Sequence, residues 1–192
     1  GAGTGLTGGA IGAGVKLDLS RYMNGIGAVD AEARTVEVEP GVVLDELNAH
    51  LTEYGLQFAA DVATSSRATI GGMIANNSCG AHSIVYGRTV DHVVELTVAL
   101  ADGRVVTFGP SRENDDRAQF LEAELGRIRD EYFGEIERRF PKVMRSNGGY
   151  GLDRLGPPGT PADPLKILCG SEGTLGIVVR AKLRLVPIPR CT

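Results

Sequence analysis

The chain has 192 residues, of which 42% are hydrophobic, and this is enough for one ordinary core or two small ones that share an interface. Its formal net charge of -4 and the lack of any dense Lys and Arg run argue against nucleic acid or an anionic membrane as the main partner. No stretch reaches the roughly 18 apolar residues that a transmembrane segment needs. The composition therefore favours a folded domain that binds a small soluble ligand.

Glycine accounts for 27 of the 192 residues, and the excess gathers in loops, most densely in residues 1–14. We expect a tight loop there, followed by an alternating strand at 15–19. Residues 3–8 match the GxGxxG spacing, but a Rossmann site needs a helix directly afterwards, so that site is disfavoured. The backbone N–H groups of the loop could still form a nest for phosphate oxygens, the alternative being a plain turn or linker.

A second alternating strand is predicted at 35–39, followed by a break at Pro40-Gly41 and a helical stripe from 43 to 54 that ends at Gly55. Residues 59–87 show little periodicity and are long for a connection within a compact domain, which is typical of a functional loop.

Two β-rich runs, 93–100 and 104–108, flank Asp102-Gly103 and predict an antiparallel hairpin. From 115 to 140, apolar residues recur every three or four positions in a charged background, which predicts a long amphipathic helix. Residues 141–164 are irregular, as a linker or a second ligand-facing loop would be. A turn at 170–174 and a final strand at 176–186 complete the chain.

Two further segments carry candidate binding groups. Residues 64–80 combine hydroxyls, carboxamides and glycines with a single charge, which suits a large neutral heterocycle such as a redox ring, although an ordinary polar loop would have the same composition. Residues 170–176 place two glycines around an acid, which is also consistent with a simple connection. The three cysteines form no CxxC pair and the three histidines lack metal-ligand spacing, so we expect no disulfide framework, no metal site and a cytoplasmic location.

In their order along the chain these motifs resemble the PCMH-type FAD-binding domain of the vanillyl-alcohol oxidase and p-cresol methylhydroxylase superfamily. The resemblance rests on the glycine loop at 1–6, the Ala-Thr-Ile-Gly-Gly segment at 68–72, Tyr-Gly at 86–87, the hairpin at 93–107 and the Gly-Ser-Glu-Gly-Thr-Leu-Gly signature at 170–176. It implies an α+β fold with a largely antiparallel sheet flanked by helices, divided into a remainder of a first subdomain (1–60) and a second subdomain (61–192).

Within the superfamily, residues 73–80 and 85–89 look like the branch of D-lactate dehydrogenase and glycolate oxidase. The long helix followed by 140–145 is similar to the long bacterial members that are fused to an iron-sulfur region. Residues 147–153 depart from the family pattern, because Gly151 stands where Asn is usual and so offers no side-chain contact. The resemblance implies oxidation of a 2-hydroxy acid (D-lactate, glycolate or D-2-hydroxyglutarate), with a quinone, a cytochrome or an iron-sulfur protein as electron acceptor.

The resemblance also implies a set of residues that bind FAD through the diphosphate, the ribityl chain, the isoalloxazine and the adenosine. These are Gly1, Ala2, Gly3, Thr4, Gly5, Leu6, Thr64, Ser65, Thr69, Gly71, Gly72, Asn76, Asn77, Gly80, Glu172, Gly173 and Ile177. The first loop has no His, and Cys79 does not fall where a linking residue is expected, so we predict non-covalent FAD.

The first residue is Gly rather than Met, and we expect the chain to lack an N-terminal part and a C-terminal cap domain that carries the catalytic base. The catalytic residues are therefore unknown, and we expect the chain alone to be inactive. Any iron-sulfur cluster is expected in the absent C-terminal region. The alternative to a purely cytoplasmic location is that the full-length protein binds peripherally at the inner membrane. Two rival functions remain open: a non-catalytic nucleotide- or phosphate-binding module, and an NADPH-dependent reductase of UDP-N-acetylmuramate synthesis on the same fold.

Overall fold

The computed structural model describes residues 1, 3–5, 8–111 and 115–189. The first half of the chain forms β1 (Ile26–Asp30), β2 (Thr35–Val38), α1 (Leu44–Leu51), the 3-10 helix η1 (Thr52–Tyr54), β3 (Leu56–Gln57), α2 (Ile70–Ala75), α3 (Ser83–Tyr86) and α4 (Thr89–His92). The second half forms β4 (Val93–Ala99), β5 (Val105–Phe108), α5 (Asp116–Arg139), the 3-10 helix η2 (Leu152–Arg154), α6 (Leu165–Leu168), β6 (Ile177–Arg184) and β7 (Val186–Pro187).

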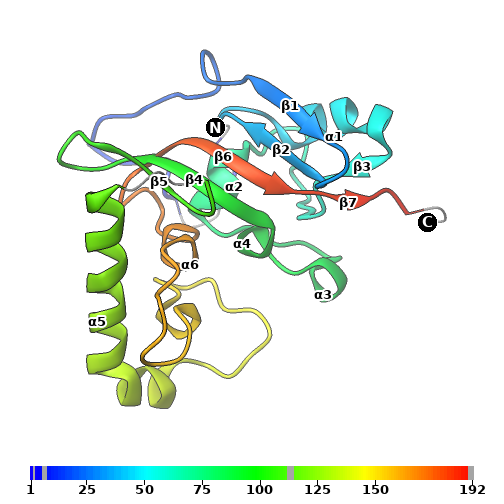
Figure 1. Cartoon of the computed structure of the whole chain (residues 1–192). Coiled ribbons are helices and arrows are strands. Elements are labelled where there is room, and N and C mark those ends of the chain that lie inside the picture. Colours follow the sequence, from blue (N-terminus) through cyan, green and yellow to red (C-terminus); the bar gives the residue numbers. More distant parts are fainter. Residues whose placement is uncertain (2, 6–7, 112–114, 190–192) are drawn as a thin grey trace.

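A five-stranded sheet with the order β1-β2-β6-β4-β5 organises the molecule (Figure 1). Every neighbouring pair in this sheet is antiparallel, and β3 pairs with β7 in a separate antiparallel ribbon. The predicted α+β fold with a largely antiparallel sheet is confirmed. The proposed division at residue 60 stays a prediction, and β2 and β6, from the two sides of that boundary, pair directly within the sheet.

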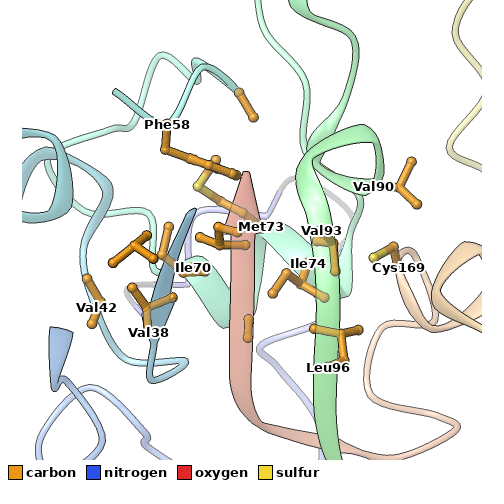
Figure 2. Close-up of a cluster of buried hydrophobic side chains, with 14 of the residues drawn as sticks. Val38, Val42, Phe58, Ile70, Met73, Ile74, Val90, Val93, Leu96 and Cys169 are labelled. Carbon is orange, nitrogen blue, oxygen red and sulfur yellow. The ribbon is translucent and has the colours of Figure 1, made fainter. Parts of the chain in front are cut away.

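The main core lies between one face of this sheet and the helices α1 and α2. Leu44, Leu47 and Leu51 bury the apolar stripe of α1, and Ile70 and Ile74 bury that of α2. Figure 2 shows Ile70, Met73 and Ile74 of α2 among Val38, Val93 and Leu96 of the strands, with Cys169 at the edge of the cluster. The sheet and the glycine-containing helix α2 therefore share one core.

Three predicted elements are confirmed because their signals are local. The helical stripe after residue 43 forms α1 and η1, and Gly55 ends it with a positive φ of 67°. The hairpin of β4 and β5 turns at Gly103, which has a φ of 82°. The long helix forms as α5, with the Asp115 side chain accepting hydrogen bonds from the backbone N–H groups of the first turn.

The predicted strand at residues 15–19 is wrong. This segment forms no strand, and Val15 and Leu17 are 90% and 57% exposed. An alternating pattern forms a strand only where a neighbouring strand pairs with it and a core takes one face, and neither is present here. The segment instead lines a cavity described below. A strand that the pattern did not predict, β1, forms a few residues later and pairs with β2.

A second, smaller core connects α5 to the irregular segment that follows it. Leu155, Ala162 and Ile167 form this cluster. Arg129 of α5 is buried beside it and donates from Nη1 to the carbonyl oxygen of Leu155 (3.0 Å) and from Nη2 to that of Thr160 (2.8 Å). The guanidinium thus fixes the segment to the helix.

Cys169 provides a pH-dependent prediction for the main core. Burial raises the pKa of its thiol from the usual 9.0 to about 12. Because the folded chain keeps a proton that the unfolded chain loses, the contribution to stability is complete below pH 9 and decreases as the pH rises toward 12. We expect the difference in free energy of unfolding between the wild type and Cys169→Ala to decrease from pH 8 to pH 11, as measured by urea unfolding. A constant difference would contradict this assignment.

Candidate cofactor site

Two adjoining cavities, with volumes of about 480 Å³ and 550 Å³, lie between the N-terminal glycine loop, α2 and the turn at 170–173. We call the smaller one the first cavity and the larger one the second cavity. Both include Gly1, Gly9, Ala10, Ala75 and Glu172 in their walls. Because they share these wall residues, the two cavities adjoin, and we call them together the hollow.

The predicted site residues divide between the two cavities. The first cavity is lined by Gly1, Gly71, Glu172, Gly173 and Ile177, and the second by Gly1, Gly3, Thr4, Gly5, Thr64, Thr69, Gly72, Asn76 and Glu172. All three sequence motifs therefore meet at this hollow. Ala2 and Leu6, which belong to the same prediction, lie outside the described residues.

The glycine loop presents its backbone to the second cavity. Gly8 and Ile11 make turn hydrogen bonds within the loop, whereas the amides of Thr4 and Gly5 have no acceptor among the described residues. A Cβ at Gly1 would lie 2.6 Å from Oγ1 of Thr69, so a larger residue could not take this position without moving that side chain. Free amides beside small residues can hold phosphate oxygens without a lysine or arginine.

The two glycines of α2 have different roles. A Cβ at Gly71 would lie 2.6 Å from Cβ of Pro40, so this glycine allows close packing against the turn that precedes α1. Gly72 faces the second cavity, and its N–H donates to Oγ1 of Thr69, the N-cap of α2. Three residues of one motif thus serve both the packing of α2 and the wall of the cavity.

The turn at 170–173 closes the other end of α2. The amides of Gly170 and Glu172 donate to the carbonyl oxygens of Ile74 (2.9 Å) and Ala75 (2.8 Å), which are the last acceptors of this helix. Glu172 and Gly173 adopt φ values of 53° and 76° to do so. This cap positions Glu172 on the wall of both cavities.

Three predicted residues do not line either cavity. The carbonyl oxygen of Ser65 accepts from the amide of Asp45 at the start of α1. Asn77 is buried, and its Oδ1 accepts from the amide of Val90 at 3.0 Å. A Cβ at Gly80 would collide with the carbonyl oxygen of Asp61. In this structure these three residues support the loops around the hollow, and their contact with a cofactor stays a prediction.

Several wall residues were not among the predicted site residues, although Ser78 and Cys79 belong to the candidate segment 64–80 and Asn147 to the possible ligand-facing loop 141–164. Cys79, Ser78 and Asn147 line the second cavity, and residues 15–19 line the first. Asn147 is far from the other motifs in sequence, so no spacing could have indicated its position. All five residues of 15–19 line the first cavity, polar and apolar alike, so the alternation in this segment does not correspond to two faces.

The charges around the hollow are few. Lys16, Asp18 and Glu172 line the first cavity, and Glu172 is the one charged residue among those that line the second cavity in the described part of the chain. No group of three or more His, Cys, Asp or Glu residues that could hold a metal ion occurs among the described residues. An anionic ligand in the second cavity would therefore be held by backbone amides and hydroxyls.

The histidines do not belong to the hollow. Nδ1 of His82 lies 2.8 Å from Oδ2 of Asp61 in an exposed pair, and neither residue lines a cavity. His92 is buried, with Nε2 2.7 Å from the carbonyl oxygen of Tyr86. The structure gives no reason to assign a catalytic role to either histidine.

A glycine-walled hollow beside an antiparallel sheet is consistent with a domain that binds a nucleotide cofactor. A family model described as "FAD binding domain" matches residues 1–109, and the chain belongs to this family. The hollow fits FAD in two respects, namely the amides of Thr4 and Gly5, which have no acceptor among the described residues, and its small wall residues.

Individual proteins extend the similarity over nearly the whole chain. D-2-hydroxyglutarate dehydrogenase from Pseudomonas putida is 40% identical over 200 residues, covering 99% of this chain and 20% of that protein. D-lactate dehydrogenase from Anaerostipes hadrus is 31% identical, covering 99% of this chain and 31% of that protein. The chain thus spans a fifth to a third of the length of these relatives.

A solved structure of alkyldihydroxyacetonephosphate synthase matches the entire chain with a TM-score of 0.65 and 22% identity, covering 29% of that protein, and this likeness supports the fold. Within the part of the chain that the structure describes, no helix is both long enough and apolar enough to cross a membrane.

Proposed function

We propose that this chain is the FAD-binding portion of a flavin-dependent oxidoreductase that oxidises a 2-hydroxy acid to the 2-oxo acid. The observation that carries the proposal is the convergence of residues 3–5, 64–76 and 170–173 on one hollow, in a chain of the FAD binding domain family. The names of the similar dehydrogenases support the substrate class, and D-2-hydroxyglutarate is the first acid to test because it is the substrate in the name of the 40% identical relative.

Bound FAD supplies the hydride acceptor for such a reaction. The residues of this chain bind and orient it. The free amides of Thr4 and Gly5 would hold the diphosphate, and the hydroxyl of Thr69 and the amide of Asn76 would contact polar groups further along the cofactor. The carboxylate of Glu172 would accept from ribose or ribityl hydroxyls, since a carboxylate beside a phosphate is repelled. The cofactor is proposed to be non-covalent.

The remaining features of the whole protein follow from the same proposal. The electron acceptor is proposed to be a quinone, a cytochrome or an iron-sulfur partner, and an iron-sulfur cluster is proposed for a region beyond this chain. The location is proposed to be cytoplasmic, with the full-length protein able to bind at the inner-membrane surface. Further domains are proposed to supply most substrate contacts and the base that takes the hydroxyl proton.

The test is the visible absorbance of the purified chain after addition of FAD and desalting. The gene-encoded polypeptide, which is the full translation product of the gene, is measured in parallel. We expect retained flavin, and we expect D-2-hydroxyglutarate, D-lactate or glycolate to bleach it in the gene-encoded polypeptide. The L-enantiomer of 2-hydroxyglutarate is the matched control and should leave the spectrum unchanged. Absence of retained flavin in both samples would show that the cofactor assignment is wrong, and bleaching by NADPH alone would favour the reductase.

A further inference from the structure

Arg88, directly before α4, carries a buried guanidinium that the cofactor site described above does not use. The residue is 3% exposed. Its Nη1 donates to the carbonyl oxygen of Ser146 at 2.6 Å and to Oδ1 of Asn147 at 3.0 Å, whereas Nη2 is buried without a hydrogen-bond partner among the described residues. Burying a cation without a carboxylate partner and with one nitrogen unpaired costs free energy. A role in stability alone therefore does not explain this arginine.

The contact of Arg88 with Asn147 fixes which way the amide of Asn147 points. Arginine can only donate, so Oδ1 of Asn147 must face Arg88 and Nδ2 must face the opposite direction. Nδ2 donates to the carbonyl oxygen of Asn77 at 2.9 Å and lies 3.7 Å from Sγ of Cys79. Both Asn147 and Cys79 line the second cavity. Arg88 thus orients a polar group at the rim of the hollow.

The segment that contains Asn147 has no regular secondary structure to hold it in place. Two weaker attachments flank the contact with Arg88. Nη1 of Arg145 donates to the carbonyl oxygen of Gly80 at 3.3 Å, and the hydroxyl of Tyr150 lies 2.8 Å from Oγ1 of Thr174. Arg145 and Tyr150 are exposed, so solvent competes for both contacts. The contact with Arg88 is part-buried, because the guanidinium is buried whereas Asn147 is exposed, so solvent competes less for it than for the two exposed contacts.

We infer that Arg88 is a positioning residue for the cofactor site: it holds Asn147 at the rim of the second cavity, where Asn147 contacts bound FAD. This inference rests on the proposed function and adds to it a contact from residues 146–147. Asn147 can contact FAD only while Arg88 holds residues 146–147 in place, so Arg88 and Asn147 act as one unit.

The test is the FAD affinity of the chain with Arg88→Met, Asn147→Ala and the double variant, measured by fluorescence titration. We expect each single variant to weaken FAD binding about 10- to 100-fold. Because the two residues act through the same contact, the double variant should be no weaker than the worse single variant. Arg88→Lys keeps the charge but not the planar fork, and should fall between the wild type and Arg88→Met.

Arg154→Met is the matched control. Arg154 also approaches the α4 region, with Nη1 4.0 Å from Oδ1 of Asp91, but it lines neither cavity. We expect wild-type FAD affinity for this variant. If Asn147→Ala or Arg88→Lys binds FAD as the wild type does, or if the effects of Arg88→Met and Asn147→Ala are additive, the inference is wrong although the proposed function stands. If neither the wild-type chain nor the gene-encoded polypeptide binds FAD, the proposed function fails and the inference with it.

Discussion

Arg129→Met is expected to lower the free energy of unfolding by about 3 kcal/mol, because each of the two carbonyl oxygens that lose their donor costs about 1–3 kcal/mol. The substitution leaves the carbonyl oxygens of Leu155 and Thr160 without their donors. It also removes the 2.7 Å hydrogen bond from Nε to Asp130, a contact that lowers the pKa of that carboxyl group. For a chain of this length the melting temperature should fall by about 6–12 °C, as measured by calorimetry or circular dichroism.

Arg127→Met is the matched control, because Arg127 lies on the same helix, two residues before Arg129. Its guanidinium is exposed and pairs with Glu124 and Glu131 on the surface of α5. Exposed pairs of this kind contribute at most about 1 kcal/mol. If the two variants unfold at the same temperature, Arg129 does not anchor the segment 152–160 to α5.

Gly72→Val is expected to weaken FAD binding about 10- to 100-fold while the chain stays folded. A Cβ at this position already lies 3.1 Å from Oγ1 of Thr69, and the two methyl groups of valine would occupy space in the second cavity. The affinity is measured by fluorescence titration with FAD, and the fold is checked by circular dichroism.

Gly134→Val, in the middle of α5, separates this effect from the general cost of valine in a helix. A Cβ at Gly134 would meet no atom within 4 Å, so this variant should bind FAD as the wild type does. Both variants replace a helical glycine by the same β-branched residue, and their helix propensities change equally. Wild-type affinity in Gly72→Val would mean that FAD does not occupy the second cavity.

The sequence predicted best the elements that local chemistry determines. The period of α5 and the Asp102-Gly103 turn of the β4-β5 hairpin need no information from distant residues. The helix α2 was missed because Gly71 and Gly72 disfavour a helix in isolation. It forms because its first amides donate to the carbonyl oxygens of Val42 and Pro40, and because a distant turn caps its last carbonyl groups.

The candidate site shows the same division between local and long-range information. The motifs that carry the family resemblance indicated most of the wall, because glycines and hydroxyls in those loops are recognisable as a pattern. Asn147 was not among the predicted site residues, since its place depends on a hydrogen bond to a residue 59 positions earlier in the chain. Residues 15–19 were misassigned because alternation alone does not specify what the apolar side chains face.

The position of β6 in the middle of the sheet has a consequence for how the chain acquires its structure. The strand is made late, at residues 177–184, yet it joins β2 to β4 and is the partner of both. During synthesis the β1-β2 and β4-β5 hairpins can form early, but each exposes an unpaired edge until β6 emerges from the ribosome. Pairing of β2 with β6 also closes a loop of well over a hundred residues, which slows folding. The two hairpins are therefore vulnerable to aggregation and proteolysis in the interval before β6 is released.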